Sequence, residues 1–157
     1  MRTKLYIDTS VIGAVCDPGS EDRMAATRRI LDGFVRDSWE GYISTLVLEE
    51  IERAPASVQF KLAQELRRCS FTVLEESGES LTLAREYVLE GAVPARCEDD
   101  ARHIAIATVN GIRIIVSWSF RHMVNIERKQ KVNSVNLRFG LPLIDIVSPW
   151  EVRDEET

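Results

Sequence analysis

Apolar and polar residues along this chain form two alternating kinds of segment. Short apolar runs, typical of buried strands, cover residues 5–7, 41–44, 70–75, 112–117 and 143–147. Between them, apolar residues recur three or four positions apart, which is the spacing of one helical face. These helical segments cover residues 20–37, 45–54, 57–68, 77–91 and 98–111, and a further helix is expected to begin near Ser119. The alternation predicts an α/β fold.

Strands separated by helices predict a mostly parallel sheet with helices on both faces, because each parallel connection must cross over the sheet. We therefore expect one three-layer domain over residues 1–157, without a linker or an internal repeat. Three helices have a distinct pattern of apolar or small residues on one face. Their members are Met24, Thr27, Leu31, Phe34 and Val35; Phe60, Ala63 and Leu66; and Ala101, Ile104, Ala105 and Thr108, the last group pointing inward.

Composition narrows the class of protein. A hydrophobic content of 45% and a charged content of 29% are ordinary for a soluble globular protein. Apolar runs do not reach the roughly 18 residues that a membrane span requires. The first residues meet an acid, Asp8, too soon to form a signal peptide, so a cytoplasmic protein without membrane association is expected.

The cysteines and the net charge bear on metal binding and on nucleic-acid binding. Cys16, Cys69 and Cys97 lie far apart and form no C-x-x-C pair, so we expect reduced, mostly packed thiols rather than a zinc site. A net charge of −5 argues against nucleic-acid binding by overall charge. It still allows local basic patches and a local group of acids.

Acids recur where the predicted strands end or the helices begin. Asp8 directly follows the first strand, Glu50 lies in the helix after the second, and Asp100 opens the helix before the fourth. Ligands of open parallel sheets bind at the carboxyl ends of strands. Carboxylates gathered there suit Mg²⁺ or Mn²⁺, which can orient a water for attack on a phosphoryl group. Acids at a helix start also stabilise the helix dipole, and acids on a helix face can simply be solvated, so spacing alone leaves both interpretations open.

Three stretches together resemble the PIN domain family of metal-dependent ribonucleases, which includes the toxins of VapBC-type toxin–antitoxin pairs. They are YIDTSVIGAV at residues 6–15, ISTLVLEEIERA at residues 43–54 and DDARHIAIATVNGIRIIVSWSF at residues 99–120. Their order and spacing match the family over nearly the whole chain. The stretches from Ser117 to His122 and from Ser134 to Arg138 are similar to a PIN subgroup with Ser-Trp-x-Phe at the last acidic motif.

The resemblance implies a role for four residues. Asp8, Glu50 and Asp100 match the first three metal-binding acids, with Mg²⁺ or Mn²⁺ as the cofactor. Ser119 stands where the family has its fourth acid, and a hydroxyl can bind a water but brings no charge. Glu49 and Asp99 neighbour two of these acids and point elsewhere, because consecutive helical residues face different directions.

The resemblance implies an endoribonuclease that is the toxin of a toxin–antitoxin pair, with an RNA substrate, an antitoxin partner and a homodimeric state. An alternative is a PIN-like module that has lost catalysis with its fourth acid and binds RNA or a protein. A phosphohydrolase with an aspartyl nucleophile is disfavoured, because Ser10 occupies the place of its second acid.

Several further residues near these motifs have two interpretations. His103 lies one turn after Asp100 and is expected to be a hydrogen-bonded structural residue. His122 could meet RNA phosphate, although a local packing role is favoured. Trp118 could stack on a base, but packing is preferred. Basic residues that could meet RNA phosphates follow the last motif, and these are Arg121, Arg128, Lys129 and Lys131.

Overall fold

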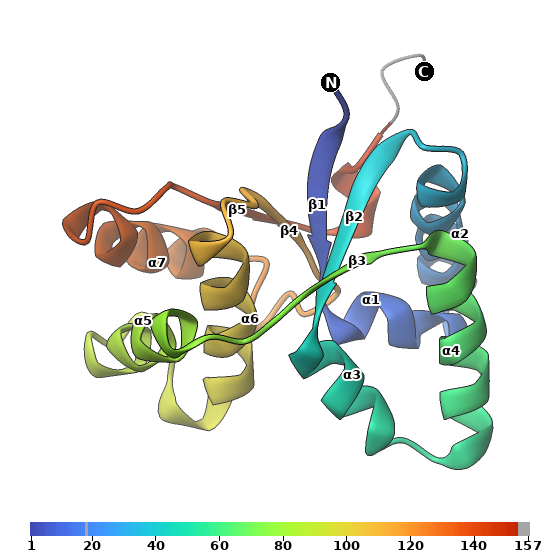
Figure 1. The fold of residues 1–157 in the computed structure, drawn as a ribbon, viewed down its shortest axis with the longest axis horizontal. Helices are drawn as coiled ribbons and strands as arrows, with labels where there is room; N and C mark the ends of the chain where they lie inside the picture. Colours follow the sequence, from blue (N-terminus) through green and yellow to red (C-terminus); the bar gives the residue numbers. More distant parts are fainter. Residues whose placement is uncertain (18, 154–157) are drawn as a thin grey trace.

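Five parallel strands form the centre of the protein. The structure is a computed structural model that describes residues 1–17 and 19–153. The strands lie in the order β3-β2-β1-β4-β5, and every neighbouring pair is parallel, as predicted (Figure 1). Their bounds are β1 Thr3–Ile7, β2 Trp39–Ser44, β3 Thr72–Leu74, β4 Ile114–Val116 and β5 Asp145–Val147.

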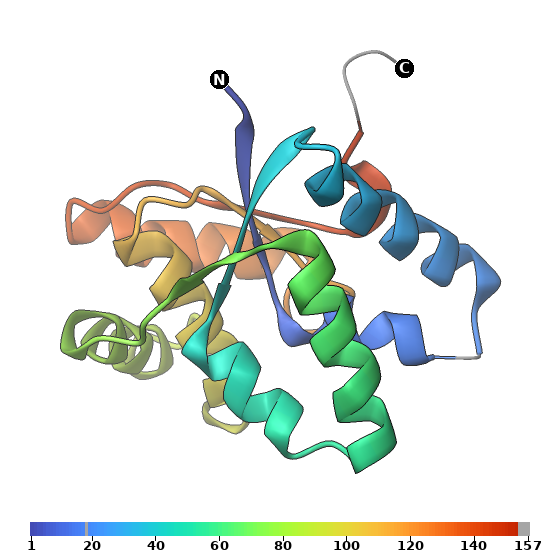
Figure 2. The ribbon, with the colours of Figure 1, turned by 45° about the vertical axis from the view of Figure 1, so that its right-hand side comes forward.

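Helices cover both faces of this sheet, which gives the three layers expected from the sequence. Helices α5, α6 and α7 lie on one side of the strands, and α1 to α4 lie on the other (Figures 1 and 2). The α-helices are α1 Thr9–Gly13, α2 Glu21–Val35, α3 Thr45–Glu52, α4 Ala56–Cys69, α5 Gly78–Leu89, α6 Glu98–Val109 and α7 Ile126–Arg138. The 3-10 helices are η1 Ala14–Cys16, η2 Ala95–Cys97 and η3 Pro149–Glu151. No helix in the described ranges is long and apolar enough to cross a membrane.

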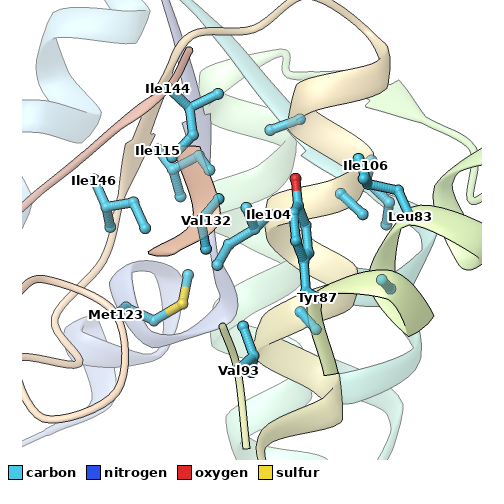
Figure 3. Packing of buried hydrophobic residues seen from close by; sticks show 14 of the residues in the cluster. Leu83, Tyr87, Val93, Ile104, Ile106, Ile115, Met123, Val132, Ile144 and Ile146 are labelled. Carbon is cyan, nitrogen blue, oxygen red and sulfur yellow. The ribbon is translucent and has the colours of Figure 1, made fainter. Parts of the chain in front are cut away.

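Two hydrophobic clusters fill the space between the sheet and its helical layers. The first joins Tyr87 of α5, Ile104 of α6 and Val132 of α7 to Ile115 of β4 (Figure 3). The second packs α1 to α4 against the opposite face of the sheet. Side chains of a strand alternate between faces, so Tyr6 enters the first cluster and its neighbours Leu5 and Ile7 enter the second. Strand β1 is therefore fixed from both sides.

The structure corrects several details of the predicted elements. The last long helix begins at Ile126 and not near Ser119, because Asn125 caps it by accepting a hydrogen bond from the Arg128 N–H at 2.8 Å. Helix α1 was not predicted, since five residues are too few to display a helical period. Val35 and Phe60 belong to the apolar helical faces named above, but they are 46% and 62% exposed and so lie outside the core.

Helix α4 turns a different face inward from the one that its apolar residues suggested. Its buried residues are Leu62, Glu65 and Cys69. Glu65 is accommodated because the guanidinium groups of Arg28 and Arg68 donate hydrogen bonds to its carboxylate. A pattern of apolar residues alone could not reveal a buried acid that is neutralised by two arginines from different helices.

Gly33 provides a test of how closely α2 packs on β2. A Cβ atom at this position would lie 2.2 Å from Cζ2 of Trp39, whose indole N–H donates to the Ile30 carbonyl at 3.0 Å. Because this ring is buried and anchored, Gly33→Ala is expected to lower the free energy of unfolding by about 2 kcal/mol, measured by urea denaturation. Gly13→Ala is the control, since its Cβ would meet nothing within 4 Å. An equal effect of the two substitutions would contradict this packing.

Candidate functional site

The order of the strands creates a switch point between β1 and β4. The chain runs from β1 outward through β2 to β3, and then returns to place β4 on the other side of β1. Connections from β1 and β4 therefore leave toward opposite faces, and ligands of open α/β sheets bind at the crevice that results. Ile7 pairs with Val116 in this register, so Asp8 and Ser117 are the first residues beyond the two strands.

Asp8 is buried at this switch point and is only 4% exposed. It is the N-cap of α1, and its Oδ1 accepts hydrogen bonds from the Ser10 hydroxyl at 2.5 Å and from the Val11 N–H at 3.3 Å. Burial raises the pKa of the Asp8 carboxyl, while the positive charge of His103 and the bonds from Ser10 and Ser117 lower it in part. A cap on a surface helix would be solvated, so burial sets this carboxyl apart from an ordinary cap.

Asp100 lies beside Asp8 at the first turn of α6. Burial raises the pKa of the Asp100 carboxyl, and the negative charge of Asp8 raises it further. His103, His122 and Arg128 act in the opposite direction through their positive charge. The structure therefore brings together two of the predicted acids, Asp8 and Asp100, closely enough for one charge to destabilise the other.

Glu50 occupies a different position at the edge of the same site. Its Oε1 lies 2.5 Å from Nε2 of His103 and accepts a hydrogen bond from the Thr9 hydroxyl at 3.2 Å. Burial alone would raise the pKa of the Glu50 carboxyl, but the hydrogen bond and charge of His103 outweigh it, so the net shift is downward. Glu50 is thus an ionised carboxylate that is already engaged by a histidine.

A buried chain of hydrogen bonds holds His103 in this position. Its Nδ1 lies 2.7 Å from the Tyr6 hydroxyl, which lies 2.7 Å from the Ser44 hydroxyl. Ser44 also caps α3 by accepting from the Val47 N–H. Since Glu50 is ionised, Nε2 of His103 must carry the hydrogen in their short contact. The histidine thus connects the site to β1 and β2, and its charge acts on all three acids.

Residues after β4 form the far wall of the site. Ser119 is half-buried; its N–H donates to the Ser117 hydroxyl at 3.0 Å, and its carbonyl accepts from the Met123 and Val124 N–H groups. Trp118 is buried, and its indole donates to the Thr27 hydroxyl at 2.9 Å, so the packing interpretation is confirmed.

The second histidine and the cysteines also have defined places. His122 contacts the Cys97 thiol at 3.6 Å on the side of Asp100. Cys69 and Cys97 are buried free thiols and Cys16 is partly buried, in agreement with the expected packed thiols.

Most of the basic residues expected to meet RNA are occupied by other contacts. Arg128 donates to the carbonyls of His122 and Ala92, Lys129 pairs with Asp145 at 3.0 Å, and Lys131 pairs with Glu127 at 2.9 Å. Arg121 is exposed. Arg121, Arg128 and Lys131 still line a polar hollow of about 380 Å³, together with residues that include Phe120, Asn125 and Glu127.

Two of the three predicted acidic residues are arranged in a way that suits a divalent cation. Carboxylates of Asp8 and Asp100 are hard oxygen ligands, and a cation between them would relieve the repulsion that raises the pKa of Asp100. Glu50 is instead held by His103. Accordingly, among residues 1–17 and 19–153 no three histidine, cysteine or acidic side chains are grouped so that they could hold a metal ion. Asp8 and Asp100 are thus the two residues best placed to bind one.

Sequence reasoning did not identify Tyr6, Ser44 or Ser117 as part of this site. Tyr6 and Ser44 lie inside strands, where a tyrosine and a serine usually indicate only packing or a helix cap. Ser117 belonged to a motif whose acid was sought two residues later. The hydroxyl of Ser10, two residues after Asp8, is the signal in the sequence of how that carboxylate is held.

Comparisons with known proteins identify the fold. No protein-family model and no curated protein sequence matches this chain. The structure of VapBC2 from Rickettsia felis bound to a DNA fragment from its promoter matches at a TM-score of 0.61 and 15% identity, over 93% of this chain and 98% of that chain. The structure of DNA-bound VapBC from Salmonella typhimurium matches at a TM-score of 0.58 and 16% identity, over 94% of this chain and 98% of that chain.

A third structure is the Mycobacterium tuberculosis toxin VapC20, which cleaves the sarcin–ricin loop. It matches at a TM-score of 0.56 and 16% identity, over 74% of this chain and 91% of that chain. Structural similarity to proteins of such low sequence identity establishes the fold of this chain. The PIN-like fold expected from the three sequence motifs is therefore confirmed.

Removal of the Tyr6 hydroxyl should reveal how much the buried hydrogen-bond chain contributes to stability. Tyr6→Phe keeps the ring but leaves Ser44 and His103 without this partner, so we expect a loss of about 1–3 kcal/mol in the free energy of unfolding. Urea denaturation measures it. Tyr42→Phe is the control, because that hydroxyl donates to the partly exposed carboxylate of Glu40 and lies outside this buried chain of hydrogen bonds. If Tyr6→Phe lowers the free energy of unfolding no more than Tyr42→Phe does, this buried chain of hydrogen bonds does not contribute to stability.

Substitution of Asp8 should change how stability depends on pH. The folded-state pKa of Asp8 lies above its unfolded value, so the folded protein holds this proton to higher pH and loses stability as pH rises through that interval. Asp8→Asn should remove this loss and raise the free energy of unfolding at neutral pH by about 1 kcal/mol. At acidic pH, where the Asp8 carboxyl is protonated in both states, the substitution should not raise the free energy of unfolding. Thermal unfolding across pH measures it, and Asp99→Asn is the control. A destabilised Asp8→Asn variant at neutral pH would contradict this account.

Proposed function

We propose that this protein is an endoribonuclease dependent on Mg²⁺ or Mn²⁺ and the toxin of a toxin–antitoxin pair. The observation that carries the proposal is the pair of neighbouring carboxylates, buried Asp8 and half-buried Asp100, at the switch point of a PIN-like sheet. Two acids in such proximity cost stability, and a bound divalent cation would offset that cost and attract a phosphodiester.

Each residue of the site has a proposed part. Asp8 and Asp100 would hold the metal ion, and Glu50, held by His103, would join them through a water. The bound ion would supply electrostatic stabilisation of the phosphoryl group and an activated water. Ser10 and the Val11 N–H fix the orientation of the Asp8 carboxylate. Ser119, in the place of a fourth acid, would orient a water through its hydroxyl.

The neighbours in structure support the choice of substrate and partner. VapC20 is a toxin that cleaves the sarcin–ricin loop, and the two VapBC assemblies are complexes bound to DNA. By analogy we propose a structured or single-stranded RNA as substrate, an antitoxin as protein partner, a homodimer as the assembled state and the cytoplasm as location. Fold-level analogy is the support for these assignments.

A second candidate function is an RNA- or protein-binding module without catalysis. Two observations favour it: Ser119 brings no charge where the family has an acid, and Glu50 is hydrogen-bonded to His103. Ser119→Asp separates the candidates. Appearance of metal-dependent cleavage only in this variant would identify the native site as degenerate.

The direct test is cleavage of purified ribosomal and transfer RNA in the presence of Mn²⁺. Asp8→Asn should lower the cleavage rate about 100-fold or more, because it weakens the hold on a cation worth several kcal/mol in the transition state. Calorimetric titration with Mn²⁺ should show weaker binding in the same variant.

Asp99→Asn is the matched control for this experiment. Asp99 adjoins Asp100 in sequence but forms surface ion pairs with Arg102 and Arg53, so the activity should be retained. If native protein and Asp8→Asn cleave equally, or if Mn²⁺ binds both equally, the proposed metal site is wrong.

A further inference from the structure

Three aromatic rings form a continuous group beside the candidate site, and we call Trp118, Phe120 and Trp150 the aromatic platform. Phe120 and Trp150 stack with centroids 5.7 Å apart and an interplanar angle of 25°. Buried Trp118 supports them edge-on, with centroids 4.7 Å from Trp150 and 6.2 Å from Phe120. Phe120 is 37% exposed and Trp150 is 43% exposed. Two large rings in mutual contact therefore remain open to solvent.

The platform is joined to the catalytic candidates by hydrogen bonds. The backbone N–H of Trp118 donates to the Ser10 hydroxyl at 2.9 Å, and this hydroxyl donates to the Asp8 carboxylate at 2.5 Å. Phe120 directly follows Ser119 in the chain. A strand of nucleic acid whose phosphodiester reaches Asp8 would therefore pass close to the exposed rings.

A cavity of about 670 Å³ opens next to the ring of Trp150. It lies between α2 and the segment around η3, and its lining residues are Asp22, Ala25, Ala26, Arg29, Trp150 and Arg153. Small residues of α2 thus leave space, while Trp150 provides an apolar wall. The volume lies within the range of small-molecule pockets, about 300–1,000 Å³.

The wall that carries Trp150 is held rigidly. Arg29 of α2 donates hydrogen bonds to the backbone carbonyls of Pro149, at 2.8 Å, and of Val152. Glu151 accepts from the Ser148 N–H at 2.8 Å and closes the turn. Trp118 is fixed in turn by Thr27. The rings are therefore ordered before any ligand binds, which lowers the entropic cost of stacking on them.

Two arginines, Arg23 and Arg153, lie beside the platform and its cavity. The guanidinium of Arg23 lies 5.2 Å from the ring centroid of Trp118 and 5.6 Å from that of Phe120. Arg153 is exposed at the rim of the cavity. Cations beside exposed rings match a ligand that combines a flat base with a phosphate, whereas an apolar peptide segment would leave these charges without a partner.

From these contacts we infer that the aromatic platform and its cavity form a nucleobase-binding subsite for single-stranded RNA. A base stacks on Trp150 within the cavity, and Arg153 and Arg23 attract the adjoining phosphates. Asp22 at the cavity wall can accept a hydrogen bond from an amino group of the base. The inference deepens the proposed function and rests on it for the identity of the RNA strand.

The test measures binding of a short, unstructured, fluorescein-labelled RNA by fluorescence anisotropy, with Asp8→Asn as the background so that the RNA stays intact. Trp150→Leu should weaken binding about 5- to 100-fold, the effect expected for one stacked base. Trp150→Phe keeps an aromatic face and should retain most of the affinity. Phe60→Leu, which removes a different exposed ring on α4, is the matched control and should bind normally.

A second variant keeps the test decisive if Trp150→Leu does not fold. Arg153→Gln removes a charge at the rim without touching the packed rings, and it should weaken binding and reduce its dependence on salt. Circular dichroism and the melting temperature identify the variants that are folded. Unchanged RNA affinity in both folded variants would overturn the inference.

The result also separates this inference from the proposed function. If cleavage depends on Asp8 but RNA affinity is independent of Trp150 and Arg153, the subsite is wrong and the nuclease proposal stands. If RNA affinity depends on them but no metal-dependent cleavage occurs, the subsite stands and the nuclease proposal fails.

Discussion

The repulsion between two neighbouring carboxylates, buried Asp8 and half-buried Asp100, is the constraint on which the arrangement of the site depends. Asp8 and Asp100 approach each other at the ends of β1 and α6, where burial favours their neutral forms. The surrounding residues partly compensate with hydroxyl donors, a backbone N–H and the charge of His103. A fold that keeps such a pair accepts a lower stability than one with neutral residues at the same positions, and this pattern is typical of functional sites.

His103 links this electrostatic arrangement to the packing of the protein. Its ring binds Glu50 on one side and the Tyr6 hydroxyl on the other, and Tyr6 belongs to the central strand. The histidine was expected to be structural because a lone histidine on a helix usually is. Its hydrogen bonds agree with that expectation, and they also bring it next to all three acids. Structural and functional roles are therefore not alternatives at this position.

The fold was predictable from the sequence because its signals are local. Alternating apolar runs and helical periods indicated the parallel sheet, and three short motifs indicated a PIN-like protein. The site was only partly predictable, since hydrogen bonds between distant residues have no local pattern. Contacts of Ser44 with Tyr6 and of Arg29 with the carbonyls around η3 join elements far apart in the chain. The short helix α1 and the outward orientation of Phe60 likewise depend on tertiary packing rather than on period.

The pairing of β1 with β4 has a consequence for folding kinetics. Tyr6 lies beside Ile115 in the sheet, so residues from well-separated parts of the chain must meet before this edge of the site exists. Closing so long a loop costs more entropy than the pairing of β1 with β2, and high contact order slows folding. A chain that has assembled only β1, β2 and β3 therefore has a half-sheet without the crevice. The crevice that places Asp8 beside Ser117 forms only after β1 and β4 have met.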